Sequence, residues 1–371
     1  MTRTLKRLES AWKRLVMRTL SGVLRGSGAS GEAPDWDAHP YRVLYLRYDR
    51  IGDMIMATGL IRAIARSHPT IELDVLASPL NASVLDGNPH VRSVLLFDRR
   101  RASSFRRVLA VLRRRRYDVV IDGMVLTPSV TTLLLMLATG ARHRIGIGGR
   151  SNDFIYTLPV APALPEAHQI AQSAATARPF GVDVATTDWH PELFLTPSEI
   201  GAAEERWGSR TAAEPRPTRL LVNVSVMLAH RVWPEDRFVA LLRHTRDRWP
   251  ELRTLIVGSP GDRARVSRIA GAAGADAVDT PRLRDALALV GTADAVFTPD
   301  TSIAHAASAF RKPAVVMLVA GSGRFAPYHA IGHALFSDGP TLDSLPLAPV
   351  ISALDELLSR AQPRTSGTAA G

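Results

Sequence analysis

From residue 41 the chain alternates short apolar runs with longer stretches of helical periodicity. The runs that predict strands are 41–47, 71–77, 91–97, 117–123 and 143–148. Stretches near 52–67, 80–87, 102–116 and 127–139 repeat their apolar positions every three to four residues and predict helices. Strands that alternate with helices indicate βαβ units, in which helices cover both faces of a parallel sheet.

The same alternation restarts after residue 219. A Pro-rich stretch, an Ala-rich helical segment and the region 189–219, which predicts a short strand, a helix and a polar connection, separate the two halves. Strands are then expected at 220–226, 253–259, 293–299 and 313–319, with helices at 234–249, 262–273 and 302–310. The pattern predicts two doubly wound Rossmann-like domains facing a cleft, with ligands at the carboxyl ends of the strands.

Five segments follow from these patterns. Residues 1–40 form an arm and linker, 41–195 an N-terminal domain, 196–219 a connection, 220–345 a C-terminal domain, and 346–371 a last helix and a disordered tail. In the arm, 2–25 has the pattern of a basic amphipathic helix. Such a helix lies on an anionic bilayer or packs on the body of its own protein, and the sequence leaves both open. Residues 26–40 read as a flexible linker.

Composition narrows the classes of protein. With 371 residues the chain is long enough for two domains, and no cysteine is present, which excludes disulfides and thiolate metal sites. The net charge of +11 is carried mainly by arginine and favours acidic partners. Because the basic segments lack interleaved aromatic residues, a nucleic-acid partner is not expected. No apolar run reaches the ~18 residues that span a bilayer, so we expect a protein that is cytosolic or attached to a membrane surface from the cytosolic side.

The first candidate for chemistry is "YDRIGDM", 48–54, where a strand turns into a helix. Asp53 falls in the first helical turn. An acid there has an ordinary explanation, because it complements the helix dipole. It is also suited to accept a proton from a hydroxyl brought to the mouth of the sheet. The spacing alone leaves both readings open.

The second and third candidates lie in the C-terminal half. In "ADAVFTPDTSIAHAASAF", 293–310, a strand, a turn with adjacent hydroxyls and a helix start together suit a diphosphate, although N-capping explains one hydroxyl equally well. In "NVSVMLAHRVWPEDRF", 223–238, Arg231 is placed to clamp a phosphate, or is simply a surface arginine. A fourth feature is the run of arginines in helix 102–116, which is either a solvated face or a surface for acidic lipid or phosphorylated glycan.

Taken together, the first three motifs resemble glycosyltransferase family 9, the ADP-heptose:lipopolysaccharide heptosyltransferases. The similarity begins with "LRYDRIGDMIMATGLIRAIARSHP", continues through "RRYDVVIDG", and resumes at "RVWPEDRFVALL" and "FTPDTSIAHAASAFRKPAVVML". It covers roughly residues 41–345. It departs from the family where Arg231 replaces a usual lysine and where Ser302-Ile303 replaces a small glycine step.

The resemblance implies an α/β protein of GT-B type and a metal-independent, inverting transfer. The N-terminal domain would bind the acceptor and the C-terminal domain the nucleotide sugar. By position, Asp53 would be the catalytic base. Donor binding would fall to Ser225, Arg231, Asp300, Thr301, Ser302 and His305, and acceptor binding to Arg47, Arg50 and Gly52.

The expected activity is therefore transfer of a heptose from an ADP-heptose-like donor to an anionic glycolipid of the lipopolysaccharide-core type, with no cofactor. The resemblance implies a cytoplasmic enzyme, peripheral on the cytoplasmic face of the inner membrane, where the basic helices 2–25 and 102–116 would hold it to the membrane surface. Two alternatives remain: a related transferase that uses another nucleotide sugar for O-antigen or another surface glycan, and a non-catalytic glycolipid-binding scaffold. The sequence assigns no role to Asp49.

Overall fold

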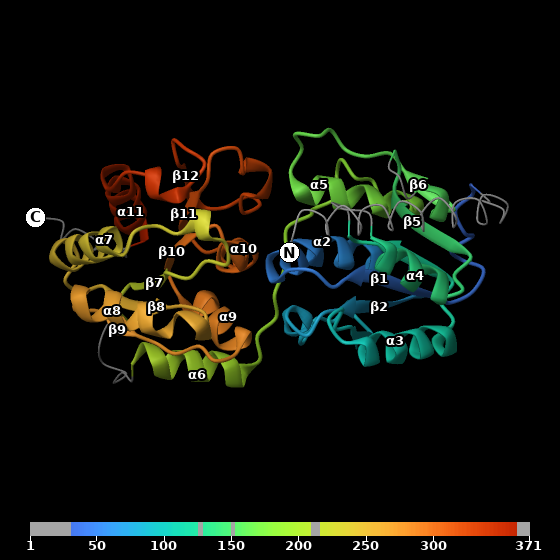
Figure 1. The fold of residues 1–371 in the computed structure, drawn as a ribbon, viewed down its shortest axis with the longest axis horizontal. Coiled ribbons are helices and arrows are strands. Elements are labelled where there is room, and N and C mark those ends of the chain that lie inside the picture. Colours follow the sequence, from blue (N-terminus) through green and yellow to red (C-terminus); the bar gives the residue numbers. More distant parts are fainter. Residues whose placement is uncertain (1–30, 125–128, 150–152, 209–215, 362–371) are drawn as a thin grey trace, which may run out of the picture. The chain divides into compact units, whose positions relative to one another are not determined.

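The structure is a computed structural model that describes residues 31–124, 129–149, 153–208 and 216–361. The chain divides into two compact units, Met1–Trp189 (unit 1) and His190–Gly371 (unit 2). Each unit contains a six-stranded sheet in which every pair of neighbouring strands is parallel (Figure 1).

Unit 1 has the strand order β3-β2-β1-β4-β5-β6. Its elements are β1 (Tyr41–Arg47), α2 (Ile51–Ser67), β2 (Ile71–Ala77), β3 (Ser93–Leu96), α3 (Ala102–Arg115), β4 (Val119–Asp122), α4 (Val130–Ala138), β5 (His143–Ile147), β6 (Leu158–Val160) and α5 (Gln169–Ala174). Short 3-10 turns lie at Ala82–Leu85, Asp153–Ile155 and Ala175–Phe180. The chain leaves β1 toward β2 but later returns to β4 on the other side of β1. The carboxyl ends of β1 and β4 therefore form the topological switch point of unit 1, where ligands bind in such sheets.

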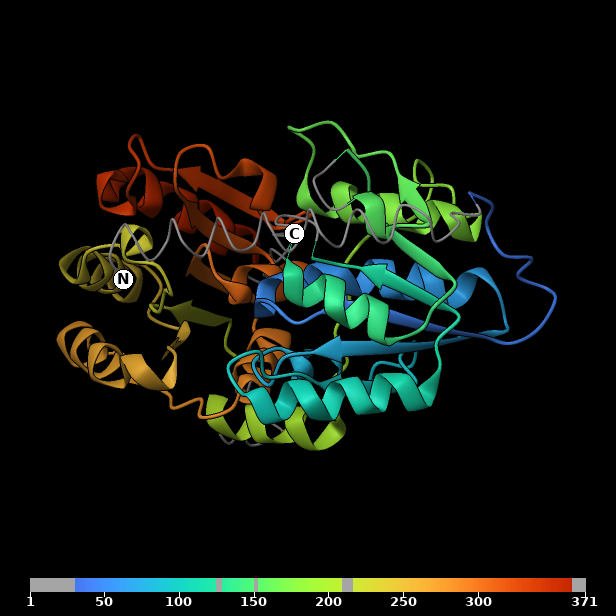
Figure 2. The same cartoon turned by 45° about the vertical axis from the view of Figure 1, so that its right-hand side comes forward.

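Packing in unit 1 follows from the alternation of side chains along β1. Leu44 and Leu46 share one apolar core with Val108 and Leu112 of α3 and with Leu133 of α4. These two helices lie side by side on that face of the sheet (Figure 2), while α2 packs with α5. Because β1 is buried on both faces, its interior is continuously apolar, as parallel sheets require.

Unit 2 has the equivalent order β12-β11-β10-β7-β8-β9. Its elements are α6 (Pro197–Trp207), β7 (Arg219–Asn223), α7 (Glu235–Arg248), β8 (Arg253–Val257), α8 (Arg263–Ala273), β9 (Asp276–Ala277), α9 (Leu283–Thr292), β10 (Ala295–Pro299), α10 (Ser302–Ala309), β11 (Ala314–Leu318), β12 (Gly332–Phe336) and α11 (Leu347–Ala361). Short 3-10 turns lie at Ala229–Arg231, Pro260–Asp262, Gly323–Phe325 and Leu342–Ser344. The switch point of this unit lies between β7 and β10.

The predicted alternation of strands and helices is confirmed, but several predictions are wrong. Segment 80–87 is no α-helix and contains only a four-residue 3-10 turn. No strand forms between 189 and 196. The sequence reading also missed β6, β9, α9 and β12. β6 contains Pro159. Proline is tolerated in a strand mainly at the edge of a sheet, and the sequence does not show that β6 is an edge strand. α9 starts after Arg282, which is not a usual N-cap residue; its capping group is Asp285 in the first turn, which accepts from the backbone N–H of Arg282 at 3.0 Å.

Residues 31–40 belong to the body of unit 1, although 26–40 was expected to be a flexible linker. Trp36 is buried, stacks on Phe180 with 4.5 Å between ring centroids, and donates its indole N–H to the carbonyl of Pro179 at 3.0 Å. The predicted helix 2–25 and tail 362–371 lie outside the described residues. Among the helices that the structure describes, none is long and apolar enough to cross a bilayer.

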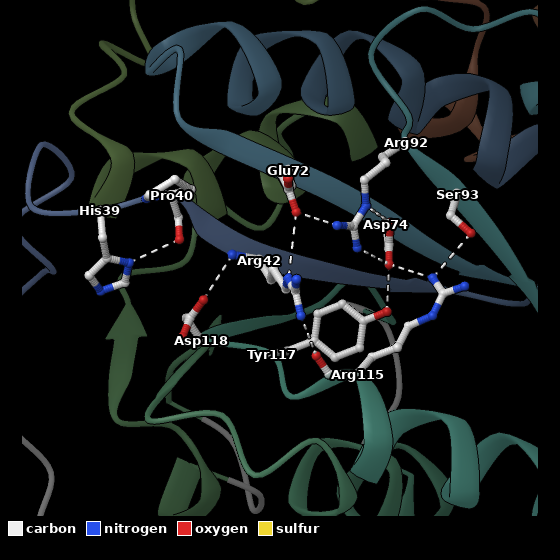
Figure 3. Close-up of polar contacts among 10 residues, drawn as sticks. All are labelled: His39, Pro40, Arg42, Glu72, Asp74, Arg92, Ser93, Arg115, Tyr117 and Asp118. Atoms are coloured by element: carbon white, nitrogen blue, oxygen red, sulfur yellow. Dashed lines mark hydrogen bonds and ion pairs between the residues drawn. The ribbon is translucent and has the colours of Figure 1, made fainter.

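Asp74, in the middle of β2, is the centre of a buried ionic network (Figure 3). Arg92 bonds both carboxylate oxygens, at 2.9 and 2.8 Å, while Arg115 and the hydroxyl of Tyr117 reach Oδ2 at 2.7 and 2.6 Å. Burial opposes ionisation, but these hydrogen bonds outweigh it and lower the pKa of the Asp74 carboxyl. Arg115, in the arginine run at the end of α3, is therefore part of the fold of unit 1.

We expect Asp74→Asn to destabilise unit 1 by about 3–5 kcal/mol, because it leaves two arginines without their buried counter-charge. For a unit of this size the thermal midpoint should fall by about 10 °C, measured by calorimetry. Since the folded pKa of Asp74 is lowered, its carboxylate stabilises the fold above the unfolded pKa of about 4. The difference between variant and wild type should therefore shrink as the pH falls through the folded pKa.

The matched control is Glu72→Gln. Glu72 contacts Arg42 and Arg92 in the same network, but its side chain is 43% exposed. An exposed ion pair contributes only about 0–1 kcal/mol, so this variant should unfold almost as the wild type does. An equal loss of stability in Asp74→Asn and Glu72→Gln would show that the buried carboxylate contributes no more to the fold than the exposed one.

Candidate functional site

The turn after β1 is organised by Arg47, the last residue of that strand. Its side chain is only 3% exposed. Nε lies 3.3 Å from Asp49 Oδ1, Nη2 lies 3.2 Å from Asp53 Oδ1, and Nη1 donates a hydrogen bond to the carbonyl of Gly123 at the end of β4. One buried guanidinium thus joins two carboxylates and the neighbouring strand at the switch point of unit 1.

Asp53 does not act as a helix cap. Arg50 is the N-cap residue of α2, and no side chain caps this helix. Asp53 lies in the first turn, with its side chain 13% exposed and its carboxylate directed to Arg47. The ordinary explanation of dipole complementarity remains compatible with this position, but capping does not account for it. The arrangement leaves the Asp53 side chain at the mouth of the sheet, paired with a buried arginine.

Burial has a marked effect on Asp49. Desolvation raises the pKa of its carboxyl to about 6, with Arg47 opposing the rise and the nearby charge of Asp53 adding to it. Tyr45, on β1, is fully buried, and burial raises the pKa of its hydroxyl to about 12, so it stays protonated. Asp49 is therefore the group of this turn that changes charge near neutral pH.

Two residues that sequence reasoning missed hold this turn in place. The buried Asn81 donates to the carbonyls of Arg47 at 3.1 Å and Arg50 at 3.5 Å, and its own oxygen accepts from the backbone N–H of Ser78 at 2.8 Å. At Gly123 a Cβ would lie 2.5 Å from the carbonyl oxygen of Leu46, so only glycine fits. Their position in the sequence could have indicated them, because Asn81 and Gly123 follow strands that end at the same edge of the sheet as β1.

The three predicted acceptor residues have different environments. Arg50 is exposed and Gly52 is partly buried. Arg47 is buried and its guanidinium contacts groups of the protein itself, so its geometry favours positioning Asp53 over contacting an acceptor directly. The exposed cation of this turn is Arg50.

In unit 2, the predicted donor residues gather at the carboxyl ends of β7 and β10. Asn223, which was not predicted, is buried at the end of β7 and donates to Thr298 Oγ1 at 3.0 Å, Thr301 Oγ1 at 3.2 Å and the carbonyl of Ser225 at 3.2 Å. Thr301 is the N-cap of α10 and accepts from the backbone N–H of Ile303 at 3.2 Å. N-capping thus explains Thr301, and the buried amide fixes it across two strands.

Arg231 and Asp300 form an ion pair beside this turn. Arg231 Nη1 lies 2.9 Å from Asp300 Oδ2 and donates to the carbonyl of Asp300 at 3.2 Å. The loop that carries Arg231 is anchored two residues later by Trp233, which is fully buried and packs edge-on against Phe238 at 5.0 Å between centroids.

The remaining predicted donor residues lie close by along the chain. Ser225 is buried, and its hydroxyl accepts from the backbone N–H of Ser259 at 2.7 Å, which ties the loops after β7 and β8. Ser302 opens α10 and is partly buried, whereas His305 faces the interior of unit 2. Within the described ranges, no three or more His, Asp or Glu side chains are grouped so that they could hold a metal ion.

Solved structures of known proteins share this fold. The crystal structure of a family 9 glycosyl transferase from Veillonella parvula matches with a TM-score of 0.77 and 16% identity, covering 88% of this chain and 99% of that one. E. coli ADP-heptose lps heptosyltransferase II has a TM-score of 0.68 and 19% identity, covering 86% and 99%. E. coli heptosyltransferase WaaC with ADP has 0.68 and 17%, covering 85% and 99%. These likenesses confirm the expected α/β fold of GT-B type.

Two sequence comparisons complete the assignment. Curated protein sequences give no significant match. The family model described as glycosyltransferase family 9 (heptosyltransferase) matches residues 105–331, which include the turn at 300–305 but begin after the turn that carries Asp53. This range is more than half of the chain, and it confirms the resemblance drawn from the motifs: the protein belongs to glycosyltransferase family 9, the heptosyltransferase family.

Proposed function

We propose that the protein transfers a heptose or related sugar, with inversion, from an ADP-sugar to an anionic glycolipid of the lipopolysaccharide-core type. The observation that carries this proposal is the carboxylate of Asp53, held on a buried arginine at the switch point of unit 1. The helix does not use this carboxylate as a cap, and the side chain is slightly exposed. A general base must be accessible in this way to the hydroxyl from which it takes a proton.

Asp53 would take the proton from the acceptor hydroxyl as the oxygen attacks the anomeric carbon of the donor. The bond from that carbon to the nucleoside diphosphate breaks, and the diphosphate leaves with the bonding electrons. Such a reaction needs a base for the nucleophile and stabilised negative charge for the leaving group. We assign the base and the acceptor to unit 1, with Arg50 and Gly52 beside the acceptor.

The leaving diphosphate is assigned to unit 2. Arg231, which is partly exposed and paired with Asp300, offers its guanidinium, and the start of α10 offers backbone N–H groups beside Thr301 and Ser302. Asp300 would face the sugar, while Ser225 and His305 would complete the donor site. These groups can balance the charge of a diphosphate without a metal ion, which is the mechanism that we propose.

The donor assignment rests on the relatives. One E. coli structure holds heptosyltransferase WaaC with ADP, and another holds it with ADP-2-deoxy-2-fluoro heptose. We extend ADP-heptose to this chain as a proposal. Transfer of another nucleotide sugar to O-antigen or another surface glycan, and a non-catalytic scaffold, are the alternatives that the following experiments separate.

Asp53→Asn should lower kcat by about 10²–10⁴-fold, because the amide cannot accept the proton. The assay is release of ADP from ADP-heptose with extracted core glycolipid. Asp37→Asn makes the same change at an exposed position of unit 1 and should leave the rate unchanged. A rate in Asp53→Asn equal to that of the wild type would contradict catalysis by Asp53, and no ADP release by either protein would favour the scaffold.

Arg231→Gln should weaken ADP binding by at least about tenfold, since it removes a charge-assisted contact to phosphate. Arg231→Lys keeps the charge and should recover part of the affinity. Titration calorimetry with ADP, UDP, GDP and CMP measures both the affinity of each variant for ADP and the preference of the protein for one nucleobase. The control Arg268→Gln removes an exposed arginine that is likewise paired with an acid, Glu235. A preference of the wild type for UDP or GDP would favour the alternative donor.

A membrane-docking role is proposed for the outer face of α3. The arginines of this face are exposed and form no ion pair among the described residues: Arg106, Arg107, Arg113, Arg114 and Arg116. A groove of about 720 Å³ between α3 and α4 adds apolar surface next to them, lined in part by Phe105, Leu109, Leu134 and Leu137. Adjacent positive charge and apolar surface suit an anionic lipid surface. The arm at 2–25, proposed for the same task, lies outside the described residues.

Replacing Arg106, Arg107, Arg113 and Arg114 together by Gln should weaken binding to phosphatidylglycerol-containing vesicles by at least about tenfold, because each arginine near an anionic surface contributes about 1 kcal/mol. Binding is measured by vesicle co-sedimentation. The control removes the same charge from exposed arginines of unit 2: Arg243, Arg246, Arg263 and Arg268. Equal losses in the two variants would indicate non-specific attraction, and deletion of residues 2–25 measures the arm separately.

A further inference from the structure

We infer that Asp49 is a positioning residue for the base: it shares the guanidinium of Arg47 with Asp53 and so prevents that guanidinium from neutralising Asp53. The inference rests on the proposed role of Asp53 as the base. It gives a function to the one acid of the turn that the sequence left without one.

The geometry of the turn sets up a competition between two acids for one cation. Asp49 Oδ1 lies 3.3 Å from Arg47 Nε, and Asp53 Oδ1 lies 3.2 Å from Nη2. Asp49 Oδ1 is buried and makes no hydrogen bond within the described parts of the chain, so the ion pair with Arg47 is the contact that the structure gives it. Nη1 is occupied by the carbonyl of Gly123. These three contacts hold the guanidinium of Arg47 between the two acids.

The other charged and titratable groups around this cluster do not replace Asp49. Tyr45 comes from β1 and remains protonated. Asp122, at the end of β4, accepts hydrogen bonds from the hydroxyl of Tyr156 at 2.7 Å and the backbone N–H of Met124 at 2.9 Å. Arg50, in the turn itself, is exposed. The charge that Arg47 presents to Asp53 is thus set mainly by the ionisation of Asp49.

The consequence for catalysis follows from the sign of the charges. An ionised Asp49 shares the positive charge of Arg47, so less of that charge acts on the carboxylate of Asp53. A protonated Asp49 leaves the whole charge of Arg47 to Asp53, and this opposes transfer of a proton to Asp53 from the acceptor hydroxyl. Because burial raises the pKa of Asp49 to about 6, activity should fall as the pH drops through this value.

The test is the pH profile of kcat/KM from pH 5 to 8.5, measured by ADP release for the wild type, Asp49→Asn and Asp53→Asn. The wild type should show a step with a midpoint near 6. Asp49→Asn should lack the step, should be about tenfold slower than the wild type at pH 8, and should approach it at pH 5. Asp49→Glu should restore part of the step, and Asp37→Asn should keep the whole of it.

The outcomes separate this inference from the proposed function. An unchanged step in Asp49→Asn, together with loss of activity in Asp53→Asn, would overturn the positioning role and leave the base in place. Full activity in Asp53→Asn would overturn both. A structural role alone would lower the rate of Asp49→Asn equally at every pH. If Asp49→Asn does not fold, as judged by circular dichroism, a wild-type profile without a step near 6 still refutes the inference.

Discussion

The buried guanidinium of Arg47 is the interaction on which the arrangement of the proposed catalytic turn depends. A cation so deeply buried is costly unless charges and hydrogen bonds compensate it. Here the compensation comes from three places at once: the turn, through Asp49; the first turn of α2, through Asp53; and the end of β4, through Gly123. The requirement to neutralise one arginine thus fixes the position of the carboxylate that we propose as the base.

In unit 2 the turns at the ends of the central strands are held together by a neutral side chain instead of a charged one. The carboxamide of Asn223 bonds Thr298 and Thr301 and so joins the ends of β7 and β10. In unit 1 a buried amide in a different place, Asn81 in the loop after β2, likewise bonds the end of β1 through the carbonyl of Arg47. In both units the side-chain amide of a buried asparagine donates hydrogen bonds to carbonyl or hydroxyl groups where strands of the sheet end. Buried polar groups need such partners. The exposed Arg50 and the partly exposed Arg231 are the cations that these two turns carry.

The sequence was most informative where one physical signal dominates. Long apolar runs predicted the central strands, and the "RIGD" turn correctly predicted that Asp53 lies in the first turn of a helix. Edge strands such as β6 and β12 are partly exposed and lack that run, and α9 has an arginine in place of a usual N-cap residue at its start. The partners of a charged side chain depend on folding as a whole: Arg47, which was expected to face the acceptor, contacts the protein's own acids. In the same way, Arg115 contacts the buried Asp74, whereas Arg113 and Arg114 remain exposed. Their order along the helix does not reveal this difference.

The most direct test of the central claim is the anomeric configuration of the product. A single displacement assisted by Asp53 attacks the face opposite the leaving diphosphate, so the new glycosidic bond must have the configuration opposite to that of the donor. Nuclear magnetic resonance of the glycolipid formed from ADP-heptose would show this directly. Inversion is the result that our account predicts. Retention of the donor configuration would contradict it, because Asp53 could not then act only as a base in one displacement.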